Sequence, residues 1–144
     1  MRVLALDLGT KTLGLAISDK TNTISSPLKV LRHDGEHFDE IIKELSNIIT
    51  ENEIDTVVLG NPKNMDNSEG FASQRSQNFK KIIDKELNIK TILIDERLST
   101  VEAENILIQS DLRRNKRKKV IDSAAAMIIL DTYLRSVKND WKYN

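Results

Sequence analysis

Cysteine is absent from the sequence, and its absence excludes several kinds of chemistry at once. No disulfide, thiolate zinc site or thiol nucleophile can form in this chain. Histidine is nearly as scarce, because the two that occur, His33 and His37, stand close together in a polar stretch and leave little for imidazole chemistry. Catalysis or metal binding must therefore rest mainly on oxygen atoms.

Long apolar segments are also missing. The longest, Ala124 to Leu130, is far shorter than the roughly 20 residues that cross a bilayer, and no charged-then-apolar leader precedes the first predicted strand. We therefore expect a cytoplasmic protein without a membrane partner. With 144 residues, 39% of them apolar and 31% charged, the chain is predicted to form one domain over residues 1–137 and a short polar tail over 138–144.

The charges balance at 22 basic and 22 acidic residues, but one segment is strongly basic. Its six positive residues are Arg113, Arg114, Lys116, Arg117, Lys118 and Lys119. Such segments neutralise nucleic-acid phosphates, although many are solvated surface loops. Because this one directly precedes an acid discussed below, we expect it to bind substrate.

Hydrophobic periodicity predicts strands first and then alternating helices and strands. Apolar runs with period two predict strands over 2–8, 13–18, 23–31, 56–60 and 90–95. Helical patterns begin near Glu36 and continue over 71–87, 100–109 and 120–137, with a loop over 61–70. The predicted fold is α/β, with a five-stranded mixed sheet of three antiparallel strands then two parallel strands, flanked by helices.

Asp7 is a carboxylate in a costly place. It ends the strand face that carries Val3 and Ala5, whereas Leu4, Leu6 and Leu8 occupy the other face. An unpaired buried carboxylate costs several kcal/mol or takes up a proton. A turn-forming residue at a strand end is the alternative, but the glycines that follow at 9 and 14 favour close approach of a phosphate.

Two further acids stand at comparable positions. Glu96 directly follows the last predicted strand, and if that strand is parallel to the first, Asp7 and Glu96 emerge at the same edge of the sheet. Asp95 could take the role proposed for Glu96, but the alternation of the strand places Asp95 on the same face as Leu93. Asp122 lies in the first turn of a nearly all-apolar helix. The alternative to a site role is an ion pair on the surface for Glu96, and a favourable interaction with the helix dipole for Asp122.

Helical spacing puts Asp122 in line with Ala126, Ile129 and Tyr133, a row expected to face inward. Three acids without histidine or cysteine suit a hard cation bound through oxygen, so we expect one or two Mg²⁺ or Mn²⁺ ions. Such ions can activate water for phosphodiester hydrolysis. The spacing does not by itself bring the acids together.

The sequence resembles the YqgF (RuvX-like) family of the RNase H-like superfamily over nearly its whole length. The matching pieces are Leu6–Gly9 with Lys11, Gly14, Leu15 and Ala16; Gly60, Pro62, Met65, Asp66, Ser68 and Gly70; Asp95–Thr100; and Lys119–Ala125 with Ile129, Leu130, Tyr133 and Leu134. Asn61 and Asn67 stand where relatives commonly carry leucine and glycine, which affects the shape of a loop rather than the acids.

This resemblance implies catalytic and metal-binding acids at the positions of Asp7, Glu96 and Asp122, and trimming of the 5′ end of precursor 16S rRNA. It also leaves cleavage of four-way DNA junctions open. Besides the basic segment, Lys11 and Arg97 are candidate phosphate contacts; Lys11 could instead pair with a nearby acid, and Arg97 could orient Glu96. The partner is then structured RNA or branched DNA, and the protein a monomer or a homodimer.

Two other classes remain open. Asp7 to Thr10 resembles the first phosphate loop of actin-type and Hsp70-type ATP-binding proteins, but those have two lobes and a second such loop, for which 144 residues leave no room. A non-catalytic nucleic-acid-binding protein is the other class, and the presence of all three acids argues against it.

Overall fold

The computed structural model describes residues 2–62, 71–96 and 124–137. Its labelled elements are β1 (Arg2–Leu8), β2 (Thr12–Ser18), β3 (Ser25–Arg32), α1 (Asp39–Glu51), β4 (Ile54–Pro62), α2 (Phe71–Leu87) and β5 (Lys90–Glu96). A further helix covers residues 124–137.

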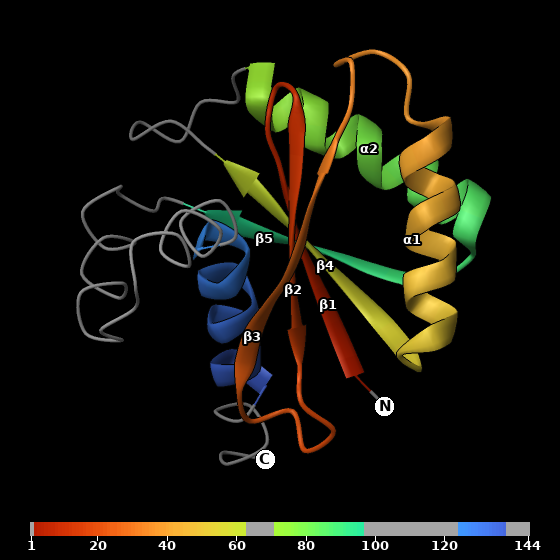
Figure 1. Cartoon of the computed structure of the whole chain (residues 1–144). Helices are drawn as coiled ribbons and strands as arrows, with labels where there is room; N and C mark the ends of the chain where they lie inside the picture. Colours follow the sequence, from red (N-terminus) through yellow and green to blue (C-terminus); the bar gives the residue numbers. More distant parts are fainter. Residues whose placement is uncertain (1, 63–70, 97–123, 138–144) are drawn as a thin grey trace, which may run out of the picture.

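The five strands form one mixed sheet in the order β3-β2-β1-β4-β5. β1 pairs antiparallel with β2, and β2 pairs antiparallel with β3, whereas β1, β4 and β5 are parallel. The predicted sheet is therefore confirmed. Because β1, β4 and β5 run in one direction, their C-terminal ends share one edge, called here the carboxyl edge (Figure 1).

The alternation within β1 separates two hydrophobic layers. Leu4, Leu6 and Leu8 belong to the layer that α1 and α2 cover, in which Phe79 is fully buried. Val3 and Ala5 belong to the opposite layer, which the helix 124–137 covers. Figure 1 shows the resulting arrangement, with α1 and α2 on one side of the sheet and the other helix on the opposite side.

The end of β4 differs from the prediction. The strand runs from Ile54 to Pro62 and not from 56 to 60, so Asn61 belongs to the sheet and not to a loop. An asparagine at this position suggests a loop, but in the strand its side chain has a hydrogen-bond partner. The Ser73 hydroxyl donates a hydrogen bond of 2.7 Å to Asn61 Oδ1. With that bond, the amide is tolerated in a position that is 7% exposed.

The start of α1 is also later than predicted. The Asp34 carboxylate accepts hydrogen bonds from the backbone N–H groups of Glu36 and His37, at 2.8 and 2.7 Å. This turn keeps both residues outside the helix. The first helical bond runs from the Ile42 N–H to the Phe38 carbonyl, so α1 begins at Asp39.

Several predicted segments lie outside the described residues. They are the helix over 100–109, the basic segment, most of the loop over 61–70 with Asn67, and the tail over 138–144. A single domain over 1–137 therefore stays a prediction. In the part of the chain that the structure describes, no helix has the length and apolar character needed to span a membrane.

Candidate active site

Asp7 lies near the end of β1, at the carboxyl edge. It pairs with Gly14 of β2, and the register Leu6 to Leu59 brings the next residue of β4, Gly60, level with it on the other side. Directly opposite positions on neighbouring strands share one face of a sheet. The carboxylate of Asp7 is therefore flanked on both strands by positions without a side chain, which leaves room for a ligand beside it.

The Asp7 side chain is partly buried and, among the described residues, makes no hydrogen bond. Burial raises the pKa of its carboxyl above the ordinary value of 3.8, and the positive charge of Arg75 opposes part of that rise. A carboxylate that is costly to ionise and has no donor of its own gains from a bound cation. Its environment fits the predicted metal ligand, and that role stays a prediction.

Arg75 is a charged residue near Asp7 that the sequence analysis did not single out. It lies in the second turn of α2, two residues after Ser73. The hydrogen bond between Ser73 and Asn61 connects the start of that helix to the end of β4. The helical spacing contains a signal for it, because Arg75 lies four residues before the buried Phe79 and therefore on the inward-facing side of the helix, where a positive charge is unusual.

Glu96 is the last residue of β5 and does not follow it, because the strand extends one residue beyond the predicted end at Asp95. The parallel course of β1 and β5, on which its predicted position depends, is confirmed. Glu96 ends β5 at the carboxyl edge, paired with Pro62 of β4. One strand separates β5 from β1, so the two backbones are about 9–10 Å apart at this edge. The side chains of Asp95 and Glu96 lie outside the described residues, so the choice between them stays a prediction.

Asp122 lies outside the described residues, but its predicted helical row is partly visible. Ala126 and Ile129 are buried and Tyr133 packs against the same layer, so these three positions do face inward. Within the described ranges, no three acidic or imidazole side chains come close enough to hold a metal ion. The convergence of Asp7, Glu96 and Asp122 therefore stays a prediction.

Lys11 lies in the turn between β1 and β2, beside the carboxyl edge. Its ammonium group donates to the backbone carbonyl of Asp34 at 3.3 Å and, among the described residues, forms no ion pair with an acid. Both interpretations of Lys11, as a phosphate contact and as a partner of a nearby acid, stay predictions. The exposed ammonium keeps donors for a phosphate. Arg97 and the basic segment lie outside the described residues.

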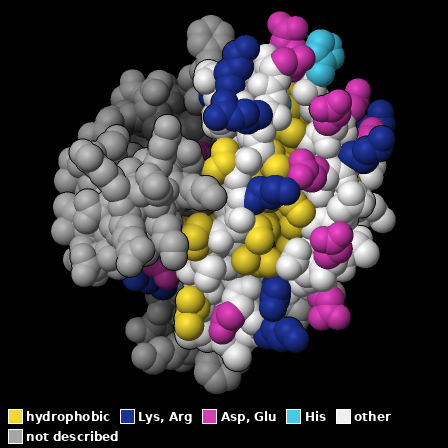
Figure 2. Space-filling model, in the orientation of Figure 1, with side chains coloured by type: hydrophobic (Ala, Val, Ile, Leu, Met, Phe, Trp, Pro, Cys, Tyr) yellow, Lys and Arg dark blue, Asp and Glu magenta, His cyan; other side chains and the backbone are white. Residues whose placement is uncertain are grey.

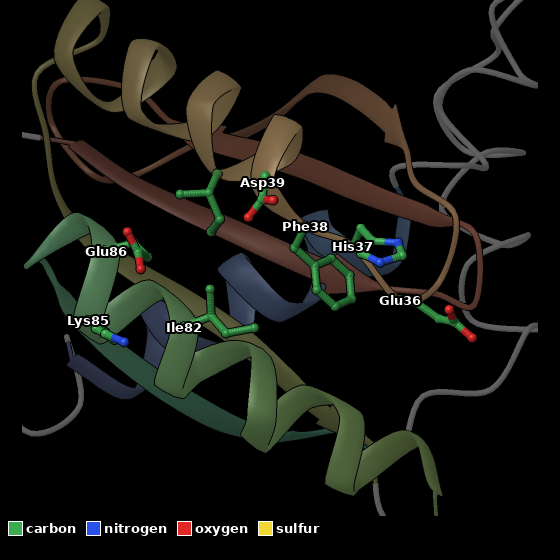
Figure 3. Close-up of a pocket in the computed structure, with 8 residues that line it drawn as sticks. Glu36, His37, Phe38, Asp39, Ile82, Lys85 and Glu86 are labelled. Atoms are coloured by element: carbon green, nitrogen blue, oxygen red, sulfur yellow. The ribbon is translucent and has the colours of Figure 1, made fainter.

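The part of the chain that the structure describes has two further surface features. Figure 2 shows acidic and basic side chains mixed on the face it presents, around an apolar group in the middle. A hollow of about 400 Å³ lies between α1 and α2, and Figure 3 shows Phe38 and Ile82 on its two sides. No predicted site residue lines it, so the carboxyl edge remains the candidate site.

Two solved structures with a similar architecture are resolvases. RuvC of Thermus thermophilus matches with a TM-score of 0.61 and 12% identity, covering 96% of this chain and 97% of that one. A fowlpox virus resolvase in complex with Holliday junction DNA matches with a TM-score of 0.58 and 20% identity, covering 95% and 99%. At such identities the likeness shows the fold alone, which is the RNase H-like α/β fold that the sequence predicted.

The family follows from sequence. The chain belongs to the family described as "RuvX: Holliday junction resolvase", whose model matches residues 1–136. A relative from Geobacillus sp. (strain WCH70), named "Putative pre-16S rRNA nuclease", is 48% identical over 94% of this chain and 99% of its own length. One of the same name from Bacillus subtilis (strain 168) is 44% identical over 95% and 99%. The predicted family is confirmed, and it is a family of nucleases.

Proposed function

We propose that this protein is a metal-dependent nuclease whose active site is the carboxyl edge. The observation that carries the proposal is the state of Asp7: a partly buried carboxylate without a hydrogen bond among the described residues, flanked by Gly14 and Gly60. Glu96 is the last residue of β5, which β4 separates from β1 in the sheet. Membership of a nuclease family supports the same conclusion.

Asp7, Glu96 and Asp122 would hold one or two Mg²⁺ or Mn²⁺ ions. Carboxylate oxygens are the ligands that these hard cations prefer, and the chain has no cysteine to favour zinc. When bound, the ions supply Lewis-acid chemistry that activates water and stabilises the leaving oxygen of a phosphodiester. The chain contributes the ligands, of which Asp7 is fixed by its place in a central strand.

The proposed substrate is precursor 16S rRNA, because the relatives described above are named "Putative pre-16S rRNA nuclease". Cleavage at its 5′ end is what the resemblance to the family implies. Cleavage of four-way DNA junctions is the second candidate, supported by the description of the family. Lys11, Arg97 and the basic segment would contact the phosphates of either nucleic acid. We predict a cytoplasmic protein, and both a monomer and a homodimer are compatible with the proposal.

The test is a pair of identical substitutions. Asp7→Asn removes the proposed ligand, whereas Asp19→Asn makes the same change in the exposed turn between β2 and β3, away from the carboxyl edge. Cleavage of a precursor 16S rRNA fragment and of a synthetic four-way junction is measured in Mg²⁺ and in Mn²⁺. Asp7→Asn should lower cleavage at least ~100-fold, since several kcal/mol of transition-state stabilisation are lost.

The Asp19→Asn control should cleave like the wild type. Wild-type rates in the Asp7→Asn protein would refute the assignment of Asp7. If the wild type bound both nucleic acids in EDTA and cleaved neither in metal, the protein would be a binding protein and the proposal of a nuclease would be wrong.

A further inference from the structure

Arg32 lies on the same face and at the same edge of the sheet as Asp7. It is the last residue of β3, the outer strand next to β2 (Figure 1), and β3 runs parallel to β1. Thr12 of β2 pairs with Arg32, and two residues further along β2, Gly14 pairs with Asp7. Paired positions and every second residue of a strand share one face. Among the described strand residues on this face at the carboxyl edge, Arg32 is the only basic one.

The separation of Arg32 from Asp7 follows from the pairing of the strands. β2 lies between β1 and β3, so the two backbones are about 9–10 Å apart across the sheet, and Arg32 lies two residues, about 7 Å, closer to the rim. The preceding residue, Leu31, is buried in the layer that α1 and α2 cover, which turns Arg32 towards the opposite face. Arg32 is therefore placed to contact a part of an extended ligand next to the part that Asp7 would contact.

The guanidinium of Arg32 is exposed and makes neither an ion pair nor a hydrogen bond in the described structure. Lys29 of the same strand differs, because it lies on the other face and its ammonium pairs with Glu44 of α1 at 2.8 Å. Three acids border a hollow next to Arg32 without forming an ion pair with it; they are Asp34, Asp39 and Glu40. All five N–H donors of the guanidinium thus stay available to an anion.

A hydroxyl lies between Asp7 and Arg32. The Thr12 side chain reaches over the end of β1, since its Oγ1 atom would be only 2.9 Å from a Cβ atom placed on Gly9. This hydroxyl has no hydrogen-bond partner within the described ranges. Gly14, beside Asp7, has no side chain at all. The face between the two charged residues therefore offers a hydrogen-bond donor and, at the level of Asp7, room for a backbone to pass.

The end of β3 is fixed to the turn between β1 and β2. The His33 N–H donates to the Lys11 carbonyl at 3.0 Å, and His33 Nε2 lies 3.1 Å from the Thr12 carbonyl. The other ring nitrogen, Nδ1, accepts the N–H of Gly35 at 2.9 Å, so Nε2 carries the ring proton and donates it to that carbonyl. Arg32 therefore starts from a fixed backbone, which lowers the entropy lost when it binds.

We propose that the nucleic acid crosses this face of the sheet from β1 towards β3, and that Arg32 binds a phosphate next to the one that is cleaved. The Thr12 hydroxyl lies along this path. The inference rests on the proposed nuclease function and deepens it by giving the course of the substrate. Arginine suits the role because its planar fork donates two parallel hydrogen bonds to one phosphate. Because Arg32 does not contact the cleaved phosphate, it acts on substrate binding and not on the chemical step.

The first experiment uses the absence of cysteine from the chain. Arg32→Cys and Lys29→Cys each introduce a single thiol, on opposite faces of the same strand. Each thiol is alkylated with azidophenacyl bromide, and the labelled protein is irradiated with the nucleic acid, of the two named above, that the wild type cleaves. Ca²⁺ replaces Mg²⁺, and a denaturing gel checks that the probe stays intact. The label at position 32 should cross-link next to the cleavage site, and the label at position 29 should not.

The second experiment measures how the affinity for the same probe depends on salt. Each phosphate contact contributes about 0.7–0.9 to the slope of log K against log salt. Arg32→Gln should lower that slope by this amount, which corresponds to binding about 5–8-fold weaker at about 0.1 M salt than the contact allows. It should raise KM and leave kcat at the wild-type value. Lys29→Gln removes the same charge from the other face and is the matched control, so its slope and KM should stay at the wild-type values.

The outcomes separate this inference from the nuclease function. If the wild type cleaved its probe but folded Arg32→Gln kept the wild-type slope, or lowered only kcat, the contact would be wrong and the nuclease function would stand. A cross-link from position 29 as strong as that from position 32, or an equal loss of slope in Lys29→Gln, would also overturn the path towards β3. If the wild type cleaved neither nucleic acid, the nuclease function would fail and this inference with it.

Discussion

Ser73 at the start of α2 donates a hydrogen bond to Asn61 at the end of β4, and both side chains are buried. The bond joins a helix and a strand that residues 63–70 separate in sequence, at the edge of the sheet where Asp7 lies. It therefore fixes the two elements that carry Arg75 and Gly60. Its contribution can be measured separately from that of the surrounding apolar core.

A double-mutant cycle tests this bond. Ser73→Ala should lower the free energy of unfolding by about 1–3 kcal/mol, because the Asn61 amide oxygen stays buried without its donor. The double mutant Asn61→Leu/Ser73→Ala lacks both partners. Its loss of unfolding free energy should be markedly smaller than the sum of the losses in the two single mutants. Urea denaturation gives the four stabilities. Additive losses would show that the bond does not couple helix and strand.

The sheet was predictable because its pattern is dense. β1 alternates so regularly that its two faces, its central position and the exit of Asp7 at one edge all follow from seven residues. Parallel pairing with β4 and β5 followed from the strand-helix-strand order. The ends of elements were less accurate, since Asn61 looks like a loop residue until its partner Ser73 is known, and since Asp34 delays the start of α1.

The site was predictable only in part, for a physical reason. Acids at strand ends follow from the alternation of a single strand, which is why Asp7 and Glu96 could be predicted as candidates; their roles stay predictions. Arg75 depends on how far α2 extends over the carboxyl edge, and this distance is set by contacts such as those of Ser73 and Phe79, which are remote in sequence from β1. Local periodicity contains no information on such a distance.

Removing the Asp7 carboxylate should stabilise the metal-free protein. Burial raises the folded-state pKa of this carboxyl above the ordinary value of 3.8, so the folded state pays a penalty for ionised Asp7 at neutral pH. Asp7→Asn removes that penalty and should melt at a higher temperature than the wild type at pH 7 in EDTA. The gain should vanish as the pH falls towards 3.8, where the carboxyl is protonated in the unfolded state too.

The same substitution at Asp19 should change the stability at pH 7 in the opposite direction. The Thr21 hydroxyl and the backbone N–H groups of Ile24 and Thr23 donate to this exposed carboxylate, and they lower its pKa to about 2. A lowered folded-state pKa stabilises the protein above the ordinary value of 3.8 and is lost as the pH falls through about 2.

Asp19→Asn should therefore melt below the wild type at pH 7 and approach it between pH 4 and about 2. Thermal denaturation followed by circular dichroism over this pH range measures both variants together. Equal pH profiles for Asp7→Asn and Asp19→Asn would contradict the environments described for the two carboxylates.

Metal binding should couple to folding through Asp7. A ligand that binds only the folded protein stabilises it by about 2.7 kcal/mol at a concentration 100 times its Kd, which for a chain of this size raises the melting temperature by roughly 5–10 °C. Mn²⁺ should produce such a rise in the wild type and in Asp19→Asn, but a much smaller one in Asp7→Asn. Because the ion competes with a proton for a carboxylate whose pKa is raised above 3.8, the rise should shrink as the pH is lowered from 7 towards 3.8. An equal rise in all three proteins would place the bound ion away from Asp7, and a rise independent of pH would mean that its ligands do not include this carboxylate.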